Sequence, residues 1–185
     1  MYAQLQSSIQ SLGNFSTEHV DQITDRIQVQ ELKKGDYVLK QGQICQSLYF
    51  VNSGSLRHYK DIDGYSELTI NLFVEGDWVI DHHSFVGQKP SENNIQAFED
   101  STMLELTMHD LHELIGRSPA FFMLGKVLEN AEPTKEESIK SPEEKYRTLL
   151  KNSPQIVQKF PLKYIASYLG MTPETLSRVR AKIKN

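Results

Sequence analysis

Residues 162–184 read LKYIASYLGMTPETLSRVRAKIK, the pattern of two short helices joined by a tight turn. Ile165 and Leu169 lie one helical turn apart, and Gly170 can adopt the positive φ of a sharp corner. Thr172 followed by Pro173 indicates a helix start, because a hydroxyl cap precedes a ring already fixed at the helical φ. The second helix repeats apolar residues that would face the first helix: Leu176, Val179 and Ile183. We therefore predict a helix-turn-helix.

The opposite face of the second helix is polar and basic, and it carries Glu174, Ser177, Arg178, Ala181 and Lys182. A helix with such a face fits the major groove of DNA. An ordinary helical hairpin would show the same spacing, so the rest of the chain must decide between the two interpretations. Residues 141–185 carry nine Lys/Arg and three Asp/Glu, a net charge of +6, whereas residues 1–140 carry −10. A basic module on an acidic body favours phosphate binding at that end, although a solvated basic face would give the same count.

Composition restricts the class of protein. The 185 residues suffice for one large domain or two small ones, and the 38% hydrophobic content supports a packed core. We expect no membrane span, because no apolar run reaches about 18 residues, and no signal peptide at the N-terminus. Cys45 is the single cysteine, which excludes an intrachain disulfide and an iron–sulfur cluster and fits a reducing compartment. We therefore expect a cytoplasmic protein.

The pattern along the chain changes twice. Residues 3–29 show helical periodicity, broken at 13–14. From residue 31 to 108 the chain reads as short β-branched and aromatic strands separated by glycine turns, which indicates a β-sandwich or barrel. Residues 61–64 carry a hairpin signal. The predicted strands are 37–40, 48–52, 55–59, 67–73, 78–81, 95–98 and 102–106.

Helical spacing returns at residue 109, and Ser118-Pro119 predicts the start of another helix. Its apolar residues recur at a 3-4-3 spacing, the pattern of a coiled-coil seam. Such a helix could pack on its own barrel or form a dimer, and we favour both together. Pro133 interrupts it, which predicts a hinge up to residue 140, and residues 141–144 form a capping box that opens the next helix. The seam consists of Phe121, Leu124, Leu128 and Ala131.

These motifs, in this order, resemble the Crp/Fnr family of bacterial transcription regulators. The matching segments are residues 33–36, 47–57 and 76–79 and the C-terminal pair of helices, so the resemblance covers nearly the whole chain. It implies an α+β fold: an N-terminal β-roll of the double-stranded β-helix (jelly-roll) type with flanking helices, a long dimerisation helix, and a small all-α helix-turn-helix domain. The implied domains are an effector roll over 1–117, the dimerisation helix and hinge over 118–140, and the DNA-binding domain over 141–185.

The resemblance implies a dimeric regulator that binds double-stranded DNA, with RNA polymerase as a further candidate partner and no membrane association. Glu174 and Arg178 fall at the family's base-reading positions, and Pro173 replaces a residue that is often arginine there. The predicted phosphate contacts are Thr172, Thr175, Ser177 and Lys182, and the predicted dimer contacts are Phe121, Leu124 and Leu128. The family's β-hairpin wing is not found before Asn185, which would remove some backbone contacts.

The family's phosphate cassette is altered here. The family has a Gly-Glu pair and, further on, an Arg followed by Ser or Thr; counting without gaps, these positions hold Ile80-Asp81 and Ser91-Glu92. A buried phosphate without a countercharge is disfavoured, so we expect neither cyclic AMP nor cyclic GMP to bind, and no cofactor. A cation, an uncharged metabolite or no ligand would suit the polar groups better. The candidate effector pocket comprises Asp81, His82, His83, Ser84, Ser91, Glu92, Asn93 and Asn94.

Two other functions compete with the regulator. A β-barrel metal enzyme of the cupin kind would need a His-x-His motif with a further Glu and His. His82-His83 are adjacent instead, and on a strand they would point to opposite faces, so we predict no metal site and no enzyme. The second alternative is a sensory or protein-interaction module of the same fold that has lost DNA binding.

Overall fold

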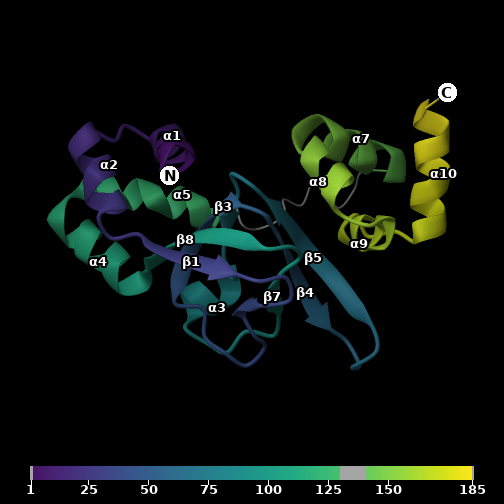
Figure 1. Ribbon diagram of the computed structural model, residues 1–185, viewed down its shortest axis with the longest axis horizontal. Helices are drawn as coiled ribbons and strands as arrows, with labels where there is room; N and C mark the ends of the chain where they lie inside the picture. The colour runs from purple at the N-terminus through teal and green to yellow at the C-terminus, as the bar shows by residue number, and fades with distance from the viewer. Residues whose placement is uncertain (1, 130–140, 185) are drawn as a thin grey trace.

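The computed structural model describes residues 2–129 and 141–184, and it has the predicted α+β fold, a β-roll followed by a helical module (Figure 1). Two helices precede the roll, α1 (Ala3–Leu12) and α2 (Thr17–Thr24). The side chain of Ser16 caps α2 by accepting a hydrogen bond from the amide of His19. Both helices bury one apolar face: Leu5, Ile9 and Leu12 in α1, and Val20 and Ile23 in α2.

The roll consists of two four-stranded antiparallel sheets with orders β1-β8-β3-β6 and β2-β7-β4-β5. All seven predicted strands are confirmed. The first strand was not predicted, because the helical pattern was extended to residue 29, whereas α2 ends at Thr24 and residues 28–32 pair with β8. The strands are β1 (Gln28–Leu32), β2 (Tyr37–Leu39), β3 (Ser47–Ser53), β4 (Ser55–Asp61), β5 (Glu67–Val74), β6 (Trp78–Val79), β7 (Asn94–Ala97) and β8 (Ser101–Thr107).

The hairpin predicted at residues 61–64 joins β4 to β5. The amide of Ile62 donates to the carbonyl of Ser66 at 2.9 Å, and Gly64 has a φ of +77°. A second glycine, Gly54, joins β3 to β4 with a φ of +97°. Positive φ is nearly strain-free only for glycine, which explains why both turns contain one.

Strand β5 lies at the edge of its sheet, where an exposed ladder could pair with another chain. Three of its amides donate to side-chain oxygens instead. The amide of Thr69 donates to Ser167 Oγ at 2.9 Å, that of Leu72 to Asn71 Oδ1 at 2.9 Å, and that of Val74 to Asp77 Oδ2 at 2.8 Å. These bonds occupy donors that a further strand would need.

One short helix in the roll corrects the prediction. His82 and His83 were placed on a strand, but they begin the helix α3 (His82–Gly87), because Asp81 Oδ1 accepts from the amide of Ser84 at 3.0 Å and caps it. Strand β6 therefore ends at Val79.

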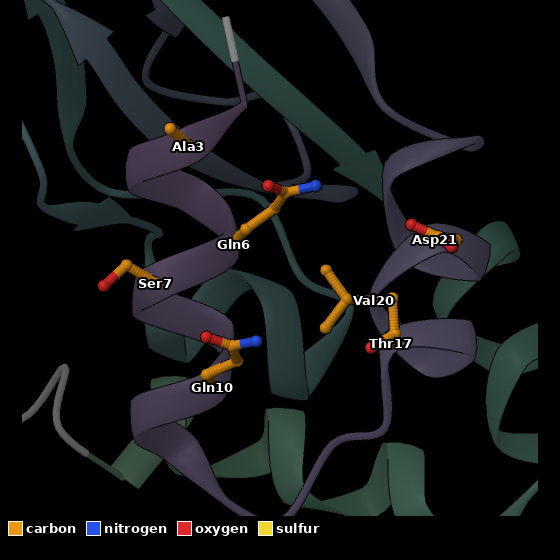
Figure 2. Close-up of a pocket in the computed structure, with 7 residues that line it drawn as sticks. All are labelled: Ala3, Gln6, Ser7, Gln10, Thr17, Val20 and Asp21. Carbon is orange, nitrogen blue, oxygen red and sulfur yellow. The ribbon is translucent and has the colours of Figure 1, made fainter.

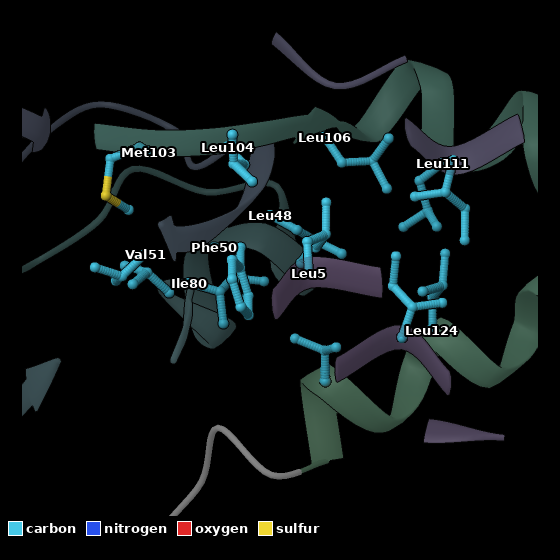
Figure 3. Close-up of a cluster of buried hydrophobic side chains, with 14 of the residues drawn as sticks. Leu5, Leu48, Phe50, Val51, Ile80, Met103, Leu104, Leu106, Leu111 and Leu124 are labelled. Carbon is cyan, nitrogen blue, oxygen red and sulfur yellow. The ribbon is translucent and has the colours of Figure 1, made fainter. Parts of the chain in front are cut away.

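The helix that closes the roll and the new start at Ser118-Pro119 are found as predicted, but the long helix expected after residue 118 is not continuous within the described residues. Helix α4 (Met108–Arg117) is followed by a 3₁₀ helix, η1 (Pro119–Leu124), and then by α5 (Gly125–Glu129). Phe121 and Leu124 are fully buried in this chain's own main core, where Phe121 lies 5.2 Å from the His19 ring and 6.3 Å from that of Phe15 (Figure 3 labels Leu124). The predicted packing on the barrel is thus confirmed. The hinge and Ala131 lie outside the described residues, as does the side chain of Leu128.

The C-terminal module contains α7 (Pro142–Asn152), α8 (Pro154–Lys159), α9 (Leu162–Tyr168) and α10 (Pro173–Lys184). The predicted capping box is confirmed: Ser141 Oγ accepts from the amide of Glu144, and Glu144 Oε2 accepts from the amide of Ser141 at 2.8 Å. Helix α8 was not predicted, although Ser153-Pro154 stands at its start. Proline at the first helical position suits a helix start, so this dipeptide opens α8.

Candidate functional site

The corner of the helix-turn-helix has the predicted geometry. Gly170 has a φ of +68°, and the amide of Met171 donates to the carbonyl of Ala166 at 2.9 Å while that of Gly170 donates to Ser167 at 3.0 Å. These two bonds form a Schellman motif, which ends α9. Lys145 Nζ donates to the carbonyl of Leu169 at 3.3 Å and places a cation at the negative end of α9.

Helix α10 begins at the predicted cap, since Thr172 Oγ1 accepts from the amide of Thr175 at 3.2 Å. Leu176 is fully buried and shares a core cluster with Ala166, a small residue that lets the two helices approach closely. The apolar face of α10 is thereby fixed inward, with Val179 and Ile183 packed against the same cluster. The opposite face must point away from the module.

The predicted base-reading residues lie on that outer face. Glu174, Ser177 and Arg178 are exposed, as is Thr172, whereas Thr175 is half-buried. The pKa of Glu174 is lowered by a hydrogen bond from its own backbone amide, then by the Thr172 hydroxyl and by the nearby charge of Arg178. An ionised carboxylate and a guanidinium one helical turn apart can meet a cytosine amino group and a guanine edge, respectively.

Lys182, the predicted backbone contact, has a partner within the module. Its Nζ lies 2.6 Å from Glu143 Oε2, and Glu143 also pairs with Arg147 at 3.0 Å. The bonds from Lys182 and Arg147 lower the pKa of Glu143, so this carboxylate stays charged. Part of the basic charge counted in the sequence is therefore neutralised inside the module.

The roll holds a buried polar cluster around Asp81, which is 2% exposed. Its Oδ2 accepts from Ser91 Oγ at 2.7 Å and from Asn93 Nδ2 at 2.9 Å, and His58 Nε2 lies 3.5 Å away. Burial raises the pKa of Asp81, but the nearby His58 and the hydrogen bonds from Ser84, Ser91 and Asn93 outweigh burial and hold that pKa below its usual value. The cluster therefore contains a carboxylate that stays ionised.

The structure brings four of the predicted pocket residues together, namely Asp81, Ser84, Ser91 and Asn93, and it adds His58, which was not predicted. The alternation of apolar and polar residues in 55–59 could have indicated that His58 points inward with Leu56. Glu92 is exposed and pairs with Lys60 Nζ at 2.5 Å, and Asn94 Oδ1 accepts from the amide of Gln41. His82 is half-buried and His83 exposed, with ring centroids 5.8 Å apart. Within residues 2–129 and 141–184, no three His, Cys, Asp or Glu side chains form a metal-binding group.

A separate depression of about 230 Å³ lies between α1 and α2 (Figure 2). Its lining is mostly polar and includes none of the predicted pocket residues. It consists of Ala3, Gln6, Ser7, Gln10, Thr17, Val20 and Asp21.

Comparison with known proteins identifies the relationship. Residues 29–118 match the family model of the cyclic nucleotide-binding domain. The chain is 25% identical over 187 residues to electron transport regulator A of Shewanella oneidensis, covering 91% of this chain and 74% of that protein. It is 26% identical over 191 residues to the fumarate nitrate reduction regulatory protein of Klebsiella oxytoca, covering 94% and 75%. The chain is thus similar, over most of its length, to regulators of the Crp/Fnr family.

Solved structures agree with the fold of this chain. FixK2 from Bradyrhizobium japonicum superposes with a TM-score of 0.66 at 16% identity, covering 85% of this chain and 84% of that one. A putative cAMP-binding regulatory protein from Silicibacter pomeroyi superposes with a TM-score of 0.68 at 17% identity, covering 98% of this chain and 88% of that one. The relatives above are regulators rather than enzymes, as predicted for this chain. Among the described residues, no helix has the length and apolarity to cross a membrane.

Proposed function

We propose that this Crp/Fnr homologue is a DNA-binding transcription regulator that acts as a cytoplasmic homodimer and reads double-stranded DNA with α10. The observation that carries the proposal is the exposed pair Glu174 and Arg178 on a helix whose other face is buried. The cap at Thr172 also supports the proposal, because it fixes where α10 begins. The positive end of the helix dipole lies there and attracts phosphate groups. RNA polymerase is a further partner in this proposal.

The test compares two variants of the full chain on double-stranded genomic fragments, with affinity measured at several salt concentrations. We expect the logarithm of the affinity to fall linearly with the logarithm of salt, as phosphate binding requires. Arg178→Ala should cost about 1–3 kcal/mol on preferred fragments and abolish the preference, whereas Lys182→Ala should weaken all fragments similarly. No binding to any fragment at low salt would favour the alternative, an interaction module that has lost DNA binding.

We also propose that the roll does not bind cyclic AMP or cyclic GMP. The supporting observation is that Asp81 and Ser91, at the two altered cassette positions, are hydrogen-bonded to each other at 2.7 Å. A cyclic phosphate would meet an ionised carboxylate there and would break bonds that Asp81 already makes. Calorimetry with either nucleotide should show no binding at micromolar concentrations, and micromolar binding that is lost in Asp81→Ala would contradict the proposal.

A further inference from the structure

The depression between α1 and α2 gathers polar side chains that have no partner. Among the residues that the structure describes, none of these side chains makes a hydrogen bond or an ion pair. They come from both helices, and Figure 2 shows Gln6 of α1 and Val20 of α2 pointing into the space between them. The polar lining residues are Gln6, Ser7, Gln10, Thr17 and Asp21.

The other polar side chains of α1 and α2 all have partners. Gln4 donates to Glu75 at 2.7 Å, and Ser8 Oγ accepts from the indole of Trp78 at 2.9 Å. The rest bond within or next to their own helix: Ser11, Glu18, His19, Gln22 and Thr24. The unused hydrogen-bonding groups of the two helices are therefore confined to the depression, rather than scattered over the exposed surface.

The walls of the depression are held in place by the rest of the protein. Leu5 and Ile9 fix α1 through fully buried side chains, and its bonds to Glu75 and Trp78 tie it to the roll. Helix α2 starts at a capping box, and Val20 at the base of the depression is only 3% exposed. A ligand would thus meet a preformed surface and would not have to order it.

The chemistry of the lining selects the class of ligand. Residues 3–24 contain no Lys or Arg, and Asp21 places a carboxylate in the lining, so an anion is disfavoured. An ammonium group only donates hydrogen bonds and would leave the amide donors of Gln6 and Gln10 unmatched. Hydroxyl groups both donate and accept, as amides and hydroxyls of the lining do, and Ala3 and Val20 can contact the C–H groups between them.

We propose that this depression binds a small neutral polyhydroxylated molecule, of the class of monosaccharides and cyclic polyols. Its volume of about 230 Å³ suits a single ring, because pockets for larger ligands begin at about 300 Å³. The site is separate from the Asp81 cluster of the roll and does not depend on the proposed DNA binding. For so few ligand atoms we expect a dissociation constant on the order of 1 mM.

The first experiment titrates the ¹⁵N-labelled full chain with two neutral probes, glucose and myo-inositol, and follows its amide resonances. Ethanolamine and inorganic phosphate are the charged comparisons. We expect saturable shifts of amides in α1 and α2 with at least one neutral probe, and weaker or no shifts with the charged ones. The absence of saturable shifts with both neutral probes up to about 20 mM would overturn the proposal. An equal or stronger response to ethanolamine or phosphate would overturn the ligand class.

The second experiment assigns the binding to the depression. Gln6→Ala should weaken binding of the responding probe about tenfold, because it removes an amide that both donates and accepts. Gln22→Ala is the matched control, since it makes the same change on α2 in a side chain that bonds Glu18 outside the depression, and it should leave the affinity unchanged.

A third variant separates a neutral ligand from a cation. Asp21→Asn should keep the affinity for the neutral probe within about threefold, because an amide oxygen still accepts from a hydroxyl. An unchanged affinity in Gln6→Ala, or equal losses in Gln6→Ala and Gln22→Ala, would overturn the site. A loss beyond tenfold in Asp21→Asn would overturn the neutral class. These experiments contain no DNA, so their failure leaves the proposed function standing.

Discussion

Asp81 illustrates how much one buried side chain contributes to the roll. Its hydrogen-bond donors come from α3 and the segment before β7, and His58 of β4 lies 3.5 Å away, so Asp81→Asn should lower the free energy of unfolding by about 2–4 kcal/mol at pH 7. Because its pKa in the folded state lies below 3.8, this contribution is complete above about pH 4 and is lost as the pH falls through the folded-state pKa. Urea denaturation at pH 7 and at pH 3 should show the difference from wild type shrinking at the lower pH. The same difference in unfolding free energy at pH 7 and at pH 3 would contradict the lowered pKa of Asp81.

At the scale of single residues, the sequence predicted those contacts that follow from the spacing of residues along the chain. The family's cassette spacing placed Asp81 and Ser91 in one candidate pocket with the neighbouring Asn93, and the structure joins all three by hydrogen bonds. Lys182 was correctly placed on the polar side of α10, but its partner Glu143 lies 39 residues earlier and meets it only when α7 packs against α10. Helix periodicity carries no information about such a contact.

The turn between β3 and β4 leaves no room for a side chain at Gly54. A Cβ there would lie 2.2 Å from Ser101 Oγ and 2.7 Å from Ser101 Cα, in addition to the strain of positive φ. Gly54→Ala should therefore lower the free energy of unfolding by about 3 kcal/mol or more. Gly64→Ala is the control, because its φ is also positive but nothing lies within 4 Å, and it should cost about 1 kcal/mol. Similar losses in thermal or urea denaturation would show that the Ser101 contact relaxes.

Among the elements, strands with alternating apolar residues and glycine turns were predictable, and β1, α3 and α8 were not. Residues 28 and 29 were included in the helical pattern, and pairing with β8 shows that a strand begins there. Helices α3 and α8 have six residues each, too few for a period to be visible. The segment after Ser118 starts as a 3₁₀ helix, with Phe121 buried in the core, and the apolar spacing alone does not distinguish this from an α-helix.

For the whole molecule, the predicted homodimer can be tested at Phe122, which is 64% exposed beside the buried Phe121. We expect Phe122→Ser to convert a dimer to a monomer in sedimentation at micromolar concentration, because an exposed phenyl ring suits an interface between copies. Phe121→Ala should instead lower the free energy of unfolding by about 3–5 kcal/mol through loss of core packing. A monomeric wild type, or a dimer that Phe122→Ser leaves intact, would contradict the prediction.

The division into an acidic body and a basic module was readable from charge alone, but the way they meet was not. The contact joins Thr69 to Ser167 and Glu99 to Lys159, residues 98 and 60 positions apart, and none of these residues forms a motif. The contact with the module also covers the edge strand β5 of the roll. Separated from the module, the roll would expose Leu72, Val74 and the amide of Thr69 on an edge strand, a ready template for fibril growth. The helical module thus also shields this edge strand from pairing with other chains.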